Sequence, residues 1–306
     1  MNTYVMDVRK LQLIGGSSFM ISLPKNWIKE NTLRQGDEIV LSVDGRHIKL
    51  SPKKTVEGDK KKVHIDKIIK YDDEFLFRFI LSLYLLGFDE IVIQDTTITP
   101  RIAVKISEIV KKLNGLEITH ASDERIILKC FTASEMDSTT LIYRMAEIVT
   151  EMMDSIDNAL MFRDFREINS AIKLEEDSDR LYYLTTRYEN KISKLSSESS
   201  DKLVAKALEE IADSLAELCL KITEYNMDTR EFLNLLREMR NLFQSAFQAY
   251  IDKDIRSSES VMNNLKKAHP RINEAPFPLQ ETYRCMKMIA ETAFNDAIRK
   301  SVIEYL

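Results

Sequence analysis

The pattern of apolar and polar residues changes near residue 134. Before this point, apolar and polar residues alternate over short stretches bounded by turn residues, as is typical of β-strands. After it, apolar residues recur every three or four positions, which is typical of helices; Leu141, Met145, Ile148, Met152 and Ile156 are an example. All 7 glycines and half of the 6 prolines precede residue 116. We therefore expect a β-rich N-terminal part and a helical C-terminal part.

The first fifty residues predict a small unit that is rich in strands. Strands are expected at residues 11–13, 19–23 and 39–43, and Pro24 fits the first position of a two-turn helix. Asp44 and Gly45 are typical of a two-residue hairpin turn that leads into a further strand. A unit this short buries little apolar surface and contains no cysteine for a disulfide. It is therefore expected to dimerise.

Residues 52–62 are charged and show no periodicity, so we interpret them as a linker. Residues 63–130 then show the order β-α-β-α-β-β, with helices that begin near Asp72 and Thr99. This order predicts a small α/β layer of helices on a sheet. Because it contains no glycine-rich phosphate loop and no nucleophile elbow, we expect a structural coupling domain; a ligand site is the alternative.

From residue 134 onward the sequence predicts six helices, with breaks near residues 164, 196–197, 228, 252–254 and 275–276. Thr132 or Ser134 can cap the first of them. Short connections between long helices favour antiparallel bundles. The first three and last three helices form two units of similar length, which indicates an internal duplication. The expected fold is thus multi-domain α+β, with domains at residues 1–54, 60–132 and 134–306. The helical domain is expected to consist of two repeats, residues 134–227 and 228–306.

Charge is distributed unevenly along the chain. Residues 1–70 contain 14 Lys and Arg and 8 Asp and Glu, a net charge of +6, whereas the whole chain has 44 and 49. The remaining 236 residues therefore carry a net charge of −11. A basic N-terminal part on an acidic body is the electrostatic pattern of contacts with nucleic-acid phosphates. The alternative is a small basic domain that binds another protein.

The sequence gives no sign of a membrane span or of a secretion signal. No apolar run approaches the ~18 to 20 residues that a membrane span requires, and the first ten residues lack the apolar region of a signal peptide. Cys130, Cys219 and Cys285 are far apart and lie in apolar segments, which favours reduced core thiols. We expect a cytoplasmic protein without membrane insertion.

Two of the predicted helices carry carboxylates four residues apart, a spacing that places both on one helix face. These pairs are Glu175 with Asp179 and Glu209 with Asp213. Placed close together, they would offer four oxygen donors suited to iron, manganese, magnesium or zinc. Glu209 and Asp213 lie nearly opposite the apolar stripe of their helix, so a metal site is expected on the bundle surface. The alternative is a solvated acidic face whose spacing arises by chance.

The N-terminal residues contain Arg9-Lys10, GGSS, SLPKNW and QGDEI. Together these motifs, within residues 7–52, resemble the SpoVT/AbrB superfamily of DNA-binding domains. In that family two chains interleave into one swapped-hairpin β-barrel whose basic loop side faces DNA. The resemblance implies an AbrB-like homodimer; antitoxins with this fold also bind proteins. It implies DNA contacts at Arg9, Lys10, Ser17, Ser18, Lys25 and Lys29.

The helical part contains LEEDSDRLYYLTTR, which ends at Arg187, and LEEIADSLAEL. These segments resemble PhoU, the regulator of phosphate uptake, and the chain is similar to archaeal PhoU-like proteins with an AbrB-type domain before the bundles. PhoU proteins bind multinuclear metal clusters through the paired carboxylates. The resemblance therefore implies metal ligands at Glu175, Asp179, Glu209 and Asp213. The second repeat has Lys287-x-x-x-Glu291 instead, and a lysine would repel a cation, so no second cluster is expected.

The sequence thus predicts a homodimeric transcriptional regulator of phosphate uptake whose helical half receives a signal. Expected partners are duplex DNA, a second copy of the chain, and a phosphate-transporter component or a sensor kinase. The expected cofactor is a metal ion on the first repeat. The alternative is an adaptor that dimerises through its N-terminal domain without binding DNA. Enzymatic activity is not expected, because a His or Lys general base is not expected near the carboxylates in sequence.

Overall fold

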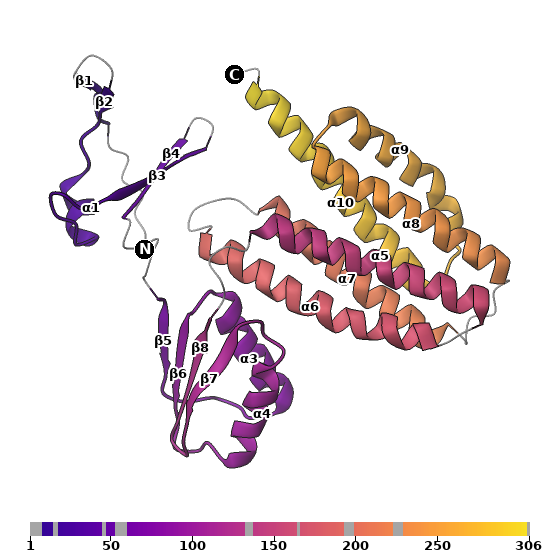
Figure 1. Cartoon of the computed structure of the whole chain (residues 1–306), viewed down its shortest axis with the longest axis horizontal. Coiled ribbons are helices and arrows are strands. Elements are labelled where there is room, and N and C mark those ends of the chain that lie inside the picture. The colour runs from indigo at the N-terminus through magenta and orange to yellow at the C-terminus, as the bar shows by residue number, and fades with distance from the viewer. Residues whose placement is uncertain are drawn as a thin grey trace. The chain divides into compact units, whose positions relative to one another are not determined.

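The computed structural model describes residues 8–14, 18–44, 47–52, 60–131, 137–163, 166–192, 199–222 and 229–304. The chain forms two compact units, residues 1–60 and residues 61–306 (Figure 1). It is mostly helical, with small sheets in its N-terminal part and helices in its C-terminal part. The three-domain boundaries stay a prediction. None of the described helices combines the length and the apolar character that a membrane span requires.

The first unit consists of two hairpins and a short helix. Strands β1 (Gln12–Ile14) and β2 (Ser18–Met20) pair antiparallel, helix α1 (Lys25–Glu30) follows, and β3 (Ile39–Asp44) pairs antiparallel with β4 (His47–Pro52). Pro24 precedes the first helical residue and is the N-cap. The predicted turn at Asp44 lies one residue too early, because Asp44 is still paired with His47. The dimeric barrel stays a prediction.

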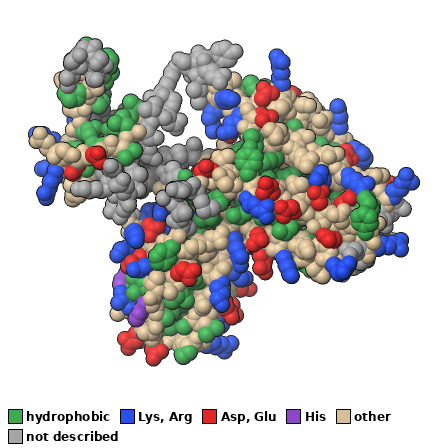
Figure 2. Space-filling model, viewed as in Figure 1, with side chains coloured by type: hydrophobic (Ala, Val, Ile, Leu, Met, Phe, Trp, Pro, Cys, Tyr) green, Lys and Arg blue, Asp and Glu red, His purple; other side chains and the backbone are tan. Residues whose placement is uncertain are grey.

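The first unit exposes its large apolar side chains. Among its residues whose burial is described, none is buried. Phe19 is 71% exposed and Leu41 is 61% exposed, although apolar side chains this large are usually covered. Figure 2 shows hydrophobic side chains gathered on this unit. The unit therefore has no apolar core of its own among the residues described.

The second unit begins with a four-stranded sheet in the order β5-β6-β8-β7. Its elements are β5 (Lys62–Ile65), α3 (Asp73–Leu85), β6 (Glu90–Gln94), α4 (Pro100–Val110), β7 (Leu116–Ala121) and β8 (Arg125–Cys130), in the predicted order. Strands β5 and β6 are parallel, and the other pairs are antiparallel. The Asp72 carboxylate accepts a hydrogen bond from the Phe75 N–H (2.9 Å), and Pro100 follows the cap Thr99, so both helices start as predicted.

Six helices make up the rest of the second unit. They are α5 (Ser138–Phe162), α6 (Arg166–Ile192), α7 (Ser200–Lys221), α8 (Thr229–Asp252), α9 (Ile255–Ile272) and α10 (Phe277–Glu304). The predicted breaks at residues 252–254 and 275–276 lie at the end of α8 and between α9 and α10. The predicted breaks near residues 164, 196–197 and 228 lie outside the described residues. The N-cap of α5 is Asp137, which accepts a hydrogen bond from the Thr140 N–H (2.7 Å). The predicted caps Thr132 and Ser134 lie outside the described residues.

The six helices share one apolar core. Its buried side chains come from all of α5–α10 and include Met152, Leu208, Met239, Leu265 and Ile289. Helix α7 packs against α10 as well as against α5 and α6. The Ser200 hydroxyl donates to Asp296 (2.7 Å) across the α7–α10 contact. The division into tandem three-helix bundles therefore stays a prediction, since the described core is continuous.

The sheet is joined to the helices at the C-terminal end of α3. Arg187 of α6 is 1% exposed and donates to the carbonyls of Tyr84 (2.7 Å) and Phe88 (2.9 Å) and to the Asp89 carboxylate (2.8 Å). Asn190 donates to the Leu85 carbonyl (2.8 Å). The last carbonyls of a helix lack partners within the helix, and positive charge is favourable there. Helix α6 thus supplies hydrogen-bond donors to the carbonyl groups at and just after the C-terminal end of α3.

Asp89 holds together three segments of the second unit. Besides Arg187, it accepts from Lys191 (2.7 Å) and from the backbone N–H of Lys61 (3.1 Å), the residue at which this unit begins. Gly87 has a φ of +82°, and a Cβ there would lie 2.7 Å from the Lys191 Cγ. A glycine is therefore required where Lys191 crosses the chain.

Candidate functional site

Three of the four predicted metal ligands lie together between α6 and α7. Carboxylate oxygens of Glu175, Asp179 and Asp213 all lie within 4.8 Å of one another. Glu175 and Asp179 are one turn apart on α6, and the two helices pack side by side. Three converging carboxylates are hard oxygen donors, so one divalent cation fits this acidic cluster. The four-residue spacing of the acidic pairs was enough to predict these three residues as candidate ligands from the sequence.

Glu209 differs from the other three carboxylates. It is 7% exposed, so the expectation of a surface position is wrong for Glu209, whereas Asp213 is exposed as expected. The single apolar stripe was misleading because α7 is packed by three other helices, and α6 covers the face that carries Glu209. Its carboxylate accepts a hydrogen bond from the Lys206 ammonium (2.6 Å). The judgement that no lysine lies near the carboxylates is also wrong, since Lys206 precedes Glu209 by three residues.

Desolvation and mutual repulsion disfavour the charged forms of the three clustered carboxylates and of Glu209. Burial raises the pKa of Glu175 to about 7, and the neighbouring carboxylates of Asp179 and Asp213 add to this. Burial likewise raises the pKa of Glu209 to about 7, against the opposing effect of Lys206. Burial also raises the pKa of Asp179. The pKa of Asp213 is raised by partial desolvation and by the neighbouring Asp179 carboxylate, although Asp213 itself is exposed. A cation would favour the charged forms of all four groups.

Tyr183 connects the acidic cluster to the sheet. Its hydroxyl donates to Asp179 (3.3 Å), while its ring meets Phe77 of α3 edge-on and packs against the apolar core of the sheet. Lys112, just after α4, lies over the Phe77 ring at 5.8 Å. Its charge opposes the rise in the pKa values of Glu175 and Asp179. No sequence signal pointed to this contact, because Phe77 and Tyr183 are far apart in the chain.

The candidate DNA-binding residues lie in the first unit. Arg9 and Lys10 are exposed before β1, and Lys25 and Lys29 are exposed on α1. Ser18 is the first residue of β2, and Ser17 lies outside the described residues.

The predicted second repeat, residues 228–306, differs in charge from helices α6 and α7. Lys287 and Glu291 of α10 form an ion pair at 3.5 Å. Within the described ranges, the grouping of three carboxylates between α6 and α7 has no counterpart on α9 and α10.

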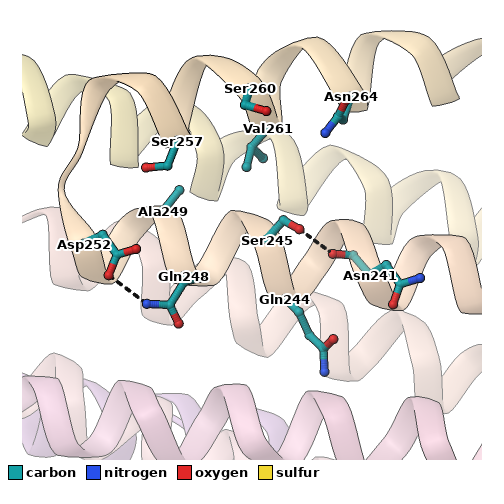
Figure 3. Close-up of a pocket in the computed structure, with 10 residues that line it drawn as sticks. All are labelled: Asn241, Gln244, Ser245, Gln248, Ala249, Asp252, Ser257, Ser260, Val261 and Asn264. Atoms are coloured by element: carbon teal, nitrogen blue, oxygen red, sulfur yellow. Dashed lines mark hydrogen bonds between the residues drawn. The ribbon is translucent and has the colours of Figure 1, made fainter.

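A polar groove runs between α8 and α9 (Figure 3). It is lined by Asn241, Gln244, Ser245, Gln248, Ala249, Asp252, Ser257, Ser260, Val261 and Asn264. An adjoining hollow shares Asn241, Ser245 and Asn264 and adds Arg237, Lys267 and Arg271. Carboxamide and hydroxyl groups both donate and accept hydrogen bonds, so the groove could bind a polar partner.

Two family models match separate parts of the chain. Residues 12–58 match the model described as antidote-toxin recognition MazE, bacterial antitoxin, and residues 142–222 match the PhoU domain. The chain carries a MazE-type domain and a PhoU domain. Both resemblances drawn from the sequence motifs are thereby confirmed. No curated protein and no solved structure matches the chain.

The two matches cover most of the candidate residues. The PhoU domain spans α6, α7 and nearly all of α5, and it contains all four candidate ligands and Lys206. The MazE-type domain spans β1 to β4, with Ser17, Ser18, Lys25 and Lys29 inside it. Arg9 and Lys10 precede the matched residues.

Proposed function

We propose that this chain is a homodimeric DNA-binding regulator of phosphate uptake, with a metal-binding PhoU domain as its sensory part. The observation that carries the proposal is the character of the MazE-type domain. It lies within residues 1–70, which carry a net charge of +6, and none of its side chains of described burial is buried. A second copy would cover Phe19 and Leu41 and would place two sets of positive charges together.

DNA binding is tested by a gel shift with duplex DNA from the promoter region of the protein's own operon at several salt concentrations. Replacing Arg9 and Lys10 by alanine removes four positive charges from a dimer. The plot of log K against log salt should become shallower by about 3.6, because each phosphate contact contributes ~0.9. The matched control is Lys266→Ala with Lys267→Ala, an adjacent basic pair on α9. Unchanged slopes in both variants would contradict a role for Arg9 and Lys10.

The PhoU domain would hold a metal ion through Glu175, Asp179 and Asp213, with Glu209 as a further donor. The bound ion would supply positive charge to a cluster in which burial disfavours four carboxylates. Because Tyr183 joins Asp179 to the core of the sheet, occupancy could bias the sheet and the linker before it. The metal site and the DNA-binding domain would then be linked: a metal ion that binds one arrangement of the protein more tightly increases the population of that arrangement.

Metal binding is tested by elemental analysis of the purified protein. The double variant Glu209→Ala with Asp213→Ala should lose most of the bound metal, since it removes half of the donor set. The control is Glu147→Ala with Glu151→Ala, an exposed carboxylate pair of the same spacing on α5. Equal metal content in the wild type and the first variant would dispose of this site.

The second candidate function is an adaptor that docks on a transporter component or a signalling kinase and does not bind DNA. The polar groove between α8 and α9 favours it, because its amide, hydroxyl and charged groups suit a protein partner. Binding to duplex DNA with a steep salt dependence favours the regulator. Absence of binding even at low salt favours the adaptor.

A further inference from the structure

The acidic cluster already contains a cation of its own. The ammonium group of Lys206 lies 2.6 Å from a Glu209 oxygen, 3.6 Å from a Glu210 oxygen and 5.2 Å from the centre of the Tyr182 ring. Glu209 is thereby engaged, whereas Glu175, Asp179 and Asp213 converge without it. The charges of the two groups act on one another: Asp213 and Asp179 affect the pKa of Glu209, and Lys206 affects the pKa values of Asp179 and Asp213.

We propose that Lys206 is the resident counter-cation of this cluster, and that a divalent cation recruits Glu209 by displacing the Lys206 ammonium group. The inference rests on the proposed metal-binding function and adds the residue that controls it. Lys206 is a positioning residue, since it would act through Glu209 without touching the metal.

The displaced side chain has another partner within reach. Glu210 is about half exposed and one turn from Lys206, so the ammonium group can keep a carboxylate contact after it leaves Glu209. The contact with the Tyr182 ring can also persist, because the lysine stem is long and flexible. The lysine itself releases no proton in this exchange, since its ammonium group keeps its charge in both arrangements.

The exchange implies selection by charge. Lys206 contributes one positive charge, so a monovalent ion gains little by replacing it near Glu209. A divalent ion adds a second charge to the carboxylate-rich site and accepts several oxygen ligands at once. The cluster should therefore bind divalent cations in the presence of excess sodium or potassium.

The test is calorimetric titration of metal-stripped full-length protein with Mn²⁺. Lys206→Met keeps an apolar stem over Tyr182 and removes the charge, so Mn²⁺ should bind about tenfold more tightly. The control is Lys221→Met, which removes a lysine paired with Glu217 on the same helix. It should change the affinity by less than about twofold.

A double-variant cycle shows whether the effect passes through Glu209. Glu209→Gln should weaken binding, and Lys206→Met should give no further gain in the Glu209→Gln background. A gain that survives Glu209→Gln would overturn the proposed route. The proposal would also be overturned if the wild type binds Mn²⁺ and Lys206→Met binds it equally well or more weakly.

Thermal unfolding separates this role from simple stabilisation. In EDTA, Lys206→Met should melt below the wild type, because four carboxylates then lack their cation; with Mn²⁺ this difference should disappear. An equal loss with and without Mn²⁺ would show a purely structural lysine. If neither the wild type nor Lys206→Met binds Mn²⁺, the proposed metal-binding function is wrong. If both bind Mn²⁺ with the same affinity, metal binding stands and only the role of Lys206 is wrong.

Discussion

Replacing Arg187 by methionine is expected to destabilise the second unit by about 3–5 kcal/mol, the cost typical of removing one partner of a buried ion pair. The guanidinium is 1% exposed and satisfies two carbonyls at the end of α3 as well as Asp89. Methionine fills much of the space but leaves those carbonyls unpaired away from water. Differential scanning calorimetry should show Tm lower by roughly 10 °C, at ~2–4 °C per kcal/mol.

The matched control for this change is Lys191→Met. Lys191 contacts the same Asp89 oxygen at 2.7 Å but is 39% exposed, so its removal should cost less than about 1 kcal/mol. Hydrogen exchange should locate the difference: Arg187→Met should speed exchange around the C-terminal end of α3 and leave α9 unchanged. Equal shifts of Tm in the two variants would argue against Arg187 as the main join between sheet and helices.

Placing a charge on the exposed apolar surface of the MazE-type domain is expected to abolish dimerisation and DNA binding together. Leu13 is 59% exposed and pairs across the hairpin with Phe19. If a second copy covers this surface, Leu13→Asp buries an unpaired carboxylate in an apolar interface, at a cost of several kcal/mol. Light scattering should then give the mass of one chain, 35.5 kDa, in place of a dimer.

The control for Leu13→Asp is Ile69→Asp, which changes a residue that is 87% exposed in the second unit. It should leave both the mass and the gel shift unchanged. A wild-type protein that is itself monomeric at micromolar concentration would contradict the dimer. A dimer that survives Leu13→Asp would place the contact elsewhere.

Local signals in the sequence were enough to predict most elements, because turns and caps depend on neighbouring residues. Thr99 with Pro100 marks the start of α4, and Asp72 caps α3 through the Phe75 N–H. The break between α8 and α9 coincides with the polar run Asp252 to Asp254, and the break between α9 and α10 lies at Pro276, both at predicted places. The prediction of an N-cap failed where several candidate residues were close in sequence: Asp137 caps α5, and the sequence had favoured residues before it.

The candidate site could be predicted only where its residues share a helix. The spacing of Glu175 and Asp179 places both on one face of α6, and this much was accessible from the sequence. The burial of Glu209 depends on which helices surround α7, a property of the tertiary fold. Lys206 was within reach, since it precedes Glu209 by three residues, but Tyr183 and Phe77 meet only through the packing of α3 on α6.

The continuous core of α5–α10 also sets how the protein can be dissected. A fragment ending at residue 222 would contain the whole PhoU match, but it would expose the face of α7 on which Ser200 and Glu210 meet α10. Such a fragment should aggregate or remain partly unfolded. Truncations and fusion junctions should therefore fall near residue 60, the last residue of the first compact unit, so that residues 61–306 stay whole.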